Sequence, residues 1–185
     1  QNAQSLAAGE TVTQTMTVAS KDGTATRDIL VTVTGANDAA TIDGASTATI
    51  TEDEGSASGS LSVSDVDHGE SEFLVADASV AGEYGDLTFN GGEWSFALNQ
   101  NAQSLAAGET VTQTMTVASK DGTATRDILV TVTGANDAAT IDGASTATIT
   151  EDEGSASGSL SVSDVDHGEN VFAVANASVA GEYGD

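Results

Sequence analysis

The chain has 185 residues, with 29 acidic and 4 basic side chains, and it contains neither cysteine nor proline. Its formal net charge of -25 repels phosphate groups, which excludes nucleic acid and anionic lipid headgroups as partners. Without cysteine, thiol catalysis, disulfide bonds and thiolate metal sites are excluded as well. Cations are the natural partners of this composition.

The arrangement of the apolar residues predicts a folded chain. Acidic chains with few aromatic residues are often disordered, but here β-branched and apolar side chains form runs such as residues 29–34. No apolar stretch approaches the ~18 residues that span a bilayer, and the N-terminal residues lack the basic and apolar regions of a signal peptide. We therefore expect a soluble chain without direct membrane insertion, and we expect any export signal to lie outside it.

An internal repeat determines the expected domain organisation. Residues 1–86 align without a gap on residues 100–185, and the aligned pairs differ only at Ser71/Asn170, Glu72/Val171, Leu74/Ala173 and Asp77/Asn176. The period of 99 residues matches a whole β-sandwich rather than a solenoid repeat. We expect a complete repeat over residues 38–136, called the central repeat below. The end of one repeat (1–37) precedes it and the beginning of another (137–185) follows it, which predicts a longer parent array.

Seven short runs of β-type residues, separated by turn signals, predict an all-β, immunoglobulin/cadherin-like sandwich for each repeat. In chain order they are a broken strand A (40–50), B (56–64), C (73–76), D (86–89), E (93–98), F (110–119) and G (125–133). Glycine-containing turns at 90–92 and 120–122 predict tight hairpins, and residues 102–109 are compatible with one helical turn. On this assignment residues 1–37 hold F and G, and residues 137–185 hold A to C.

Alternation within the predicted strands indicates which side chains form the core. Trp94, Phe96 and Leu98 share one face of strand E, and Val111, Met115 and Val117 share one face of strand F. The opposite faces carry serine and threonine. This pattern predicts two packed sheets with a polar outer surface.

Several segments carry a resemblance to a known family. Val-Thr-Val-Thr-Gly-Ala-Asn-Asp-Ala at 130–138, together with residues 103–110, 120–124, 149–154 and 160–166, resembles the VCBS-type repeat of giant bacterial surface proteins. The resemblance implies a cadherin-like sandwich that serves as an extender domain of an RTX adhesin. It also implies calcium near the domain junctions and a location outside the cell, on the surface of a Gram-negative bacterium.

Two sequence features that are associated with RTX adhesins are absent from this chain. The family commonly has a proline shortly after the Asn-Asp pair, where this chain has alanine at positions 39–40 and 138–139. The linker therefore lacks one fixed φ angle. The glycine-rich nonapeptide that binds calcium in parallel β-rolls is absent from this sequence.

Acidic residues concentrate where one repeat is expected to meet the next. In a seven-strand sandwich the B–C and F–G loops lie at the N-terminal pole, and the A–B and E–F loops lie at the C-terminal pole. The junction should therefore bring residues 52–54 towards the B–C loop of the following repeat. Oxygen ligands without a histidine or cysteine cluster favour Ca²⁺. The expected ligands are Glu52, Asp53, Glu54, Asn136, Asp137, Asp164, Asp166 and Glu169, with Asn37, Asp38, Asp65, Asp67 and Glu70 at the preceding junction.

Other interpretations of the same residues remain open. The Asp-x-Asp at 65–67 resembles the start of an EF-hand loop but lacks its later ligands, so a solvated acidic loop is the alternative. Asp121 is expected to form a turn. The pattern does not indicate an enzyme, because His68 and His167 pair with no convincing nucleophile. A ligand- or carbohydrate-binding module would need exposed aromatics, whereas Trp94 is expected in the core.

We therefore expect a structural extender repeat whose calcium-bound junctions hold a distal adhesive domain away from the cell, for adhesion or biofilm formation. Its expected partners are the neighbouring repeats, and the distal ligand is not identified by the sequence. Nearly identical repeats also predict strand exchange between them.

Overall fold

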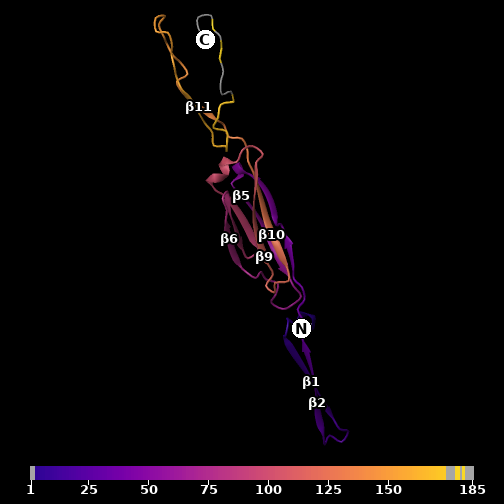
Figure 1. The fold of residues 1–185 in the computed structure, drawn as a ribbon. Helices are drawn as coiled ribbons and strands as arrows, with labels where there is room; N and C mark the ends of the chain where they lie inside the picture. The colour runs from indigo at the N-terminus through magenta and orange to yellow at the C-terminus, as the bar shows by residue number, and fades with distance from the viewer. Residues whose placement is uncertain (1–2, 174–177, 180, 182–185) are drawn as a thin grey trace.

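The structure is a computed structural model that describes residues 3–173, 178–179 and 181. The molecule is elongated, with an N-terminal hairpin at one end, a sandwich in the middle and a C-terminal segment at the other end (Figure 1). Among the described residues, no helix is long and apolar enough to cross a membrane.

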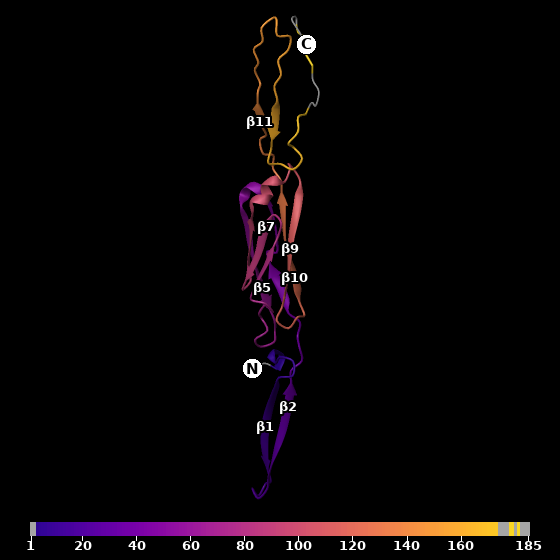
Figure 2. The same cartoon turned by 60° about the vertical axis from the view of Figure 1, so that its left-hand side comes forward.

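The middle of the molecule is a sandwich of two sheets. The first sheet has the order β4-β10-β9 and the second has the order β3-β5-β8-β7-β6. Figure 2 labels β9 and β10 of the first sheet and β5 and β7 of the second. The strands are β3 (Thr41–Gly44), β4 (Thr47–Thr51), β5 (Ser56–Ser64), β6 (Asp77–Ala81), β7 (Gly85–Asn90), β8 (Glu93–Leu98), β9 (Thr110–Ala118) and β10 (Thr125–Thr133). The predicted all-β sandwich is therefore confirmed.

Strand A is broken because the chain changes sheets in its middle. β3 pairs antiparallel with β5, whereas β4 pairs parallel with β10 in the other sheet. The crossing residues are held from both sides. The indole Nε1 of Trp94 donates to the Ala45 carbonyl at 2.6 Å, and Leu129 N donates to the Ser46 carbonyl at 2.8 Å.

The prediction for strand C was wrong in position. Residues 73–76 make only one bridge, from Phe73 to Ser119, and the strand that follows is β6, which pairs with β7 in the opposite sheet. The Phe73 ring packs edge-on against Phe89 of β7, with ring centroids 4.9 Å apart, where the chain passes from one sheet to the other. The apolar run that suggested a buried strand includes Leu74 and Val75, which are 60% and 55% exposed.

The core forms where the inward faces of the two sheets meet. Trp94 and Phe96 of β8 are 2% and 1% exposed, and they pack in one cluster with Ile128 and Val130 of β10, which are fully buried. Burying a side chain of this size contributes roughly 1.5–3 kcal/mol relative to exposure. The core position predicted for Trp94 is thereby confirmed, with its N–H satisfied by Ala45.

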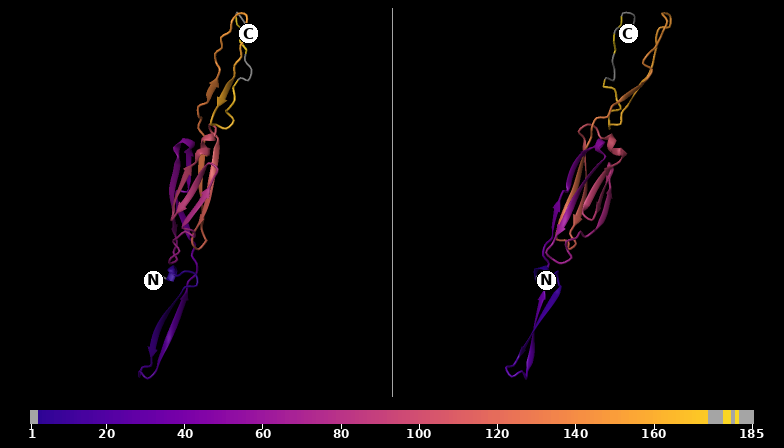
Figure 3. Two further views of the ribbon diagram at one scale, coloured as in Figure 1. Left: turned by 90° about the vertical axis from the view of Figure 1, so that its left-hand side faces the viewer. Right: turned by 180° about the vertical axis from the view of Figure 1, so that it is seen from behind.

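The ends of the chain repeat parts of this sandwich. β1 (Thr11–Ala19) and β2 (Thr26–Thr34) form an antiparallel hairpin with the same register as β9 and β10. β11 (Thr140–Gly143) pairs with β12 (Leu160–Ser163) as β3 pairs with β5. Figure 3 shows the two segments extending from opposite ends of the sandwich. Residues 174–175 of the strand C expected in the last repeat lie outside the described residues.

Candidate metal centre

The short 3-10 helix η2 (Glu52–Glu54) places Glu52 at the C-terminal pole of the central repeat. A capping box forms it: the Glu54 carboxylate turns back and accepts the backbone N–H of Thr51 at 2.6 Å. Glu52 points the other way and is only 3% exposed. Its carbonyl accepts from Gln103 Nε2 at 3.1 Å, which joins η2 to the helix η3 (Gln100–Ser104). One residue of the acidic loop is thus buried at the junction.

The linker after β10 lies against this pole. Gly134 approaches the turn after η3 so closely that a Cβ atom there would lie 2.2 Å from the carbonyl oxygen of Ala106. Gly134 N donates to the Glu109 carbonyl at 2.8 Å, and Ala135 N donates to Glu52 Oε1 at 2.8 Å. The glycine therefore allows the linker to reach the buried carboxylate.

The B–C loop of the following repeat completes the arrangement. Asp137 N donates to Asp166 Oδ2 at 3.0 Å, and Asp166 N donates to Asp164 Oδ1 at 2.9 Å. A further backbone bond, from His167 N to the Ser104 carbonyl at 2.9 Å, connects this loop directly to η3 of the central repeat. Asp166 is fully buried as a result.

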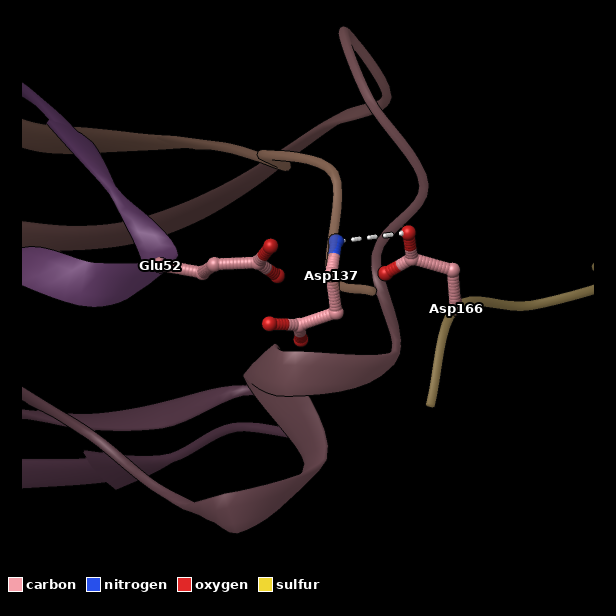
Figure 4. A group of neighbouring side chains, drawn as sticks. All are labelled: Glu52, Asp137 and Asp166. Carbon is pink, nitrogen blue, oxygen red and sulfur yellow. Dashed lines mark hydrogen bonds between the residues drawn. The ribbon is translucent and has the colours of Figure 1, made fainter. Parts of the chain in front are cut away.

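Three carboxylates from three different parts of the chain converge here. Each of Glu52, Asp137 and Asp166 offers an oxygen, and these oxygens lie within 4.8 Å of one another (Figure 4). Among the described residues, Glu52 Oε2 and Asp166 Oδ1 are buried and find no hydrogen-bond partner. Burial raises the pKa of Glu52, and the charges of Asp137, Asp166 and Asp53 raise it further, while the Ala135 N–H opposes them. Within the described residues, no ion pair with a basic side chain balances the charge of the cluster.

A second carboxylate cluster lies in the B–C loop of the central repeat. Oxygens of Asp65, Asp67 and Glu70 also lie within 4.8 Å of one another, and Asp67 is 2% exposed. In the part of the chain that the structure describes, each residue has one buried oxygen without a hydrogen-bond partner: Asp65 Oδ2, Asp67 Oδ1 and Glu70 Oε2. Burial raises the pKa of Glu70, with further contributions from Asp67, Asp65 and Asp121, and with Lys120 opposing.

The two junctions of the chain share one geometry. Asp38 N donates to Asp67 Oδ2 at 2.8 Å, as Asp137 N does to Asp166. His68 N donates to the Ser5 carbonyl at 3.1 Å, as His167 N does to Ser104. The same two backbone contacts therefore form at both junctions of this chain.

The two clusters of converging carboxylates do not include Asp53, Glu54, Asp164 or Glu169. Asp53 and Glu54 are exposed, and the Glu54 carboxylate is used by the capping box. Asn136 and Asn37 are exposed, and their Nδ2 atoms donate to the carbonyls of Asp137 and Asp38. Asp164 orients Asp166, and Glu169 is exposed. The hydrogen bonds of the two asparagines and of Asp164 hold the backbone next to the clustered carboxylates, and their role as ligands stays a prediction.

Two contacts at the N-terminal pole were not expected from the sequence. Lys120 Nζ donates to the Gly69 carbonyl at 2.7 Å and pairs with Glu72 at 2.9 Å, which joins the F–G turn to the B–C loop. Asn37 Nδ2 donates to Asp121 Oδ2 at 3.1 Å. The local sequence gives no signal for the Asn37 contact. For the Lys120 contact it gives only a weak hint, which is a lysine in a chain rich in acidic loops.

Asp121 acts as the turn former of the F–G hairpin. Its carboxylate accepts from Ser119 Oγ at 2.6 Å and from Thr123 Oγ1 at 2.5 Å. The Ser119 and Thr123 hydrogen bonds hold the pKa of Asp121 well below its usual range. The Ser-x-Asp-x-Thr spacing recurs at residues 20–24, where Asp22 accepts from Ser20 and Thr24 and has its pKa lowered to about 2.

The chemistry of both clusters fits a hard divalent cation. Their ligands are carboxylate oxygens alone, which suit Ca²⁺ rather than zinc or copper. Buried carboxylate oxygens without donors are energetically costly unless a cation or proton neutralises them. The unpartnered oxygens of Glu52 and Asp166 meet this description at the intact junction.

Comparison with known proteins identifies one family. The family described as "Bacterial cadherin-like domain" matches residues 37–134, which is more than half of the chain. No curated protein matches the sequence.

Proposed function

Because the chain belongs to the bacterial cadherin-like domain family, we propose that it is a structural extender segment of a large secreted adhesin, stiffened by Ca²⁺ at its inter-repeat junctions. In this proposal it projects a distal binding domain from the surface of a Gram-negative bacterium, as the VCBS-type repeats of RTX adhesins do. Domains with this cadherin-like sandwich are typically non-catalytic.

The observation that carries the proposal is the origin of the three converging carboxylates. Glu52 belongs to the central repeat, Asp137 to the linker and Asp166 to the following repeat. An ion held by all three would bind both repeats and the segment between them. Such an ion supplies only charge neutralisation and attachment, so its effect would be mechanical rather than chemical.

The charges make the stiffness of the junction depend on the ion. Without a cation, burial raises the pKa of Glu52 most, and the negative charges of Asp137 and Asp166 raise it further because like charges repel one another. A cation that binds only the aligned arrangement stabilises it by mass action, by about 4 kcal/mol at a thousandfold excess over Kd. The hydrogen bond from His167 to Ser104 would then orient the repeats, and the ion would hold them in that orientation.

Small-angle X-ray scattering of the chain with Ca²⁺ and then with a chelator tests the proposal. We expect the maximum dimension to be larger and better defined with Ca²⁺, because aligned repeats form a rod. The Glu52→Gln variant should lose most of this difference, whereas Asp53→Asn, an exposed neighbour outside the cluster, should keep it. Equal dimensions with Ca²⁺ and with chelator would refute the proposal.

The burial of Trp94 argues against the alternative of a carbohydrate-binding module. Trp94, the only tryptophan of the chain, is 2% exposed and donates its N–H to Ala45 within the protein. A sugar platform requires an exposed ring face.

A further inference from the structure

Strand β9 forms an unusually unprotected sheet edge. It lies at the end of the order β4-β10-β9, and natural sheets normally protect such an edge with charge, proline, a bulge or short length. β9 has nine residues, Thr-Val-Thr-Gln-Thr-Met-Thr-Val-Ala, with neither charge nor proline nor glycine. The other edge strands of the central sandwich, β3, β4 and β6, have four or five residues each.

The register with β10 shows which backbone groups of β9 point outward. Ser119 N donates to the Ala124 carbonyl and Gly134 N donates to the Glu109 carbonyl, so odd-numbered residues of β9 bond to β10. Even-numbered residues direct N–H and C=O away from it. One outward group is already used, because the Ala118 carbonyl accepts from Leu74 N at 2.9 Å.

The remaining outward groups form a continuous row. The N–H and C=O groups of Thr110, Thr112, Thr114 and Thr116 make no backbone hydrogen bond to another strand or loop within the described part of the chain. The side chains of these four threonines are exposed on the outer face of the sheet. We call this row the 110–116 edge.

We propose that the 110–116 edge binds a second copy of this chain by antiparallel pairing of the two β9 strands. Two chains that each carry a net charge of -25 repel one another, and an uncharged nine-residue strand lets their backbones meet without opposing carboxylates. A strand edge also needs a partner that presents the same alternation of donors and acceptors, and an identical edge does so when it is antiparallel. This inference is independent of the metal at the junctions.

The arrangement of the four threonines selects a register. A two-fold axis at Gln113 places Thr110 of one copy opposite Thr116 of the other, and Thr112 opposite Thr114, so that every pair exchanges two hydrogen bonds. If one copy slides by two residues so that Thr112 lies opposite Thr112, Thr116 has no residue of the other β9 opposite it. If the copy slides by two residues in the other direction, Thr110 lies opposite Ala118, whose carbonyl already accepts a hydrogen bond from Leu74 N.

The interface predicted in this way is small, so a single contact is expected to be weak. The same nine residues recur in β1, so an array presents the edge once in every repeat, and simultaneous contacts multiply the affinity. Added salt should strengthen the association, because it screens the repulsion between the two acidic chains.

Sedimentation equilibrium of the full chain, at concentrations up to about 1 mM because the interface is small, measures the association. We expect a monomer–dimer equilibrium that shifts towards dimer with added salt. The Thr15→Pro/Thr114→Pro variant removes outward N–H groups from both copies of the edge without removing a bond to β2 or β10, and it should be monomeric. Ser79→Pro is the matched control, since its N–H points outward from β6 in the other sheet, and it should still dimerise. A monomeric unmodified chain, or dimers of the double variant, would overturn the proposal.

Disulfide cross-linking tests the register and does not depend on the proline variants folding. The chain has no cysteine of its own, so a Thr110→Cys chain can be mixed with a Thr116→Cys chain under mild oxidation. Antiparallel pairing places these two positions opposite each other, at the separation that a disulfide accepts. We expect cross-linked heterodimers to exceed either homodimer at least tenfold. Homodimers of Thr110→Cys as the main product would exclude this register.

Discussion

Replacing Gly134 by alanine should damage the junction more than any exposed substitution near it. The added Cβ would lie 2.2 Å from the Ala106 carbonyl oxygen and 2.4 Å from that of Leu105, and both contacts are with backbone atoms that cannot rotate away. Overpacking of this kind costs about 1–3 kcal/mol, and rigid contacts favour the upper end. The linker must also give up the Gly134 bond to Glu109 or move Ala135 away from Glu52.

The loss can be measured with the single tryptophan of the chain. Trp94 lies in the core of the central repeat, so its fluorescence reports thermal unfolding of that repeat. A loss of about 3 kcal/mol corresponds to a fall in Tm of about 12–24 °C for a domain of this size. Gly108→Ala is the control for the loss of glycine's backbone freedom. Gly108 has a φ of 79°, and a Cβ atom there would meet no other atom within 4 Å, so this variant has the backbone strain without the steric clash. A fall at Gly134 that is smaller than the fall at Gly108 would refute the steric argument.

Two further predictions concern charges at the poles. The pKa of Glu52 is raised in the folded state, so the folded chain binds the proton more tightly than the unfolded chain does, and metal-free stability should increase as pH falls from 7 towards about 5. Melting curves in chelator at both pH values test this prediction. The increase in Tm between pH 7 and about pH 5 should be smaller in Glu52→Gln than in the unmodified chain. Lys120→Met should cost less than about 1 kcal/mol, because its ion pair with Glu72 is half exposed. A double-mutant cycle with Glu72→Val, the residue present at Val171 in the next repeat, measures the pair directly, and a coupling energy above 2 kcal/mol would contradict the assignment.

The alternation of side chains was sufficient to predict most strands, because one face of each is buried. Strands B, E and G were placed within the bounds of β5, β8 and β10, and the inward positions of Trp94 and Phe96 followed from a period of two. Strand C failed because Leu74 and Val75 are apolar but exposed. Hydrophobicity identifies candidates for burial, and it does not reveal that the chain changes sheets after Phe73 and pairs with β7.

The candidate metal centre could be predicted as a region but not as a set of ligands. The order of the loops in a sandwich indicated that residues 52–54 face the following B–C loop. It could not distinguish Glu52 from Glu54, because that choice depends on which carboxylate caps η2. The bond between His167 and Ser104 uses backbone atoms only, so no side-chain pattern encodes it.

The parallel pairing of β4 with β10 has a consequence for a chain that is pulled at both ends. Tension reaches the central repeat through β3 and β4 and leaves it through β10. The pairs from Thr47 with Leu129 to Thr51 with Thr133 therefore carry the load along the strand axes, in shear. In this geometry all the hydrogen bonds between the two strands must break almost together, whereas strands pulled apart from one end open one bond at a time. Each sandwich is thus expected to resist extension along the direction in which the molecule is elongated.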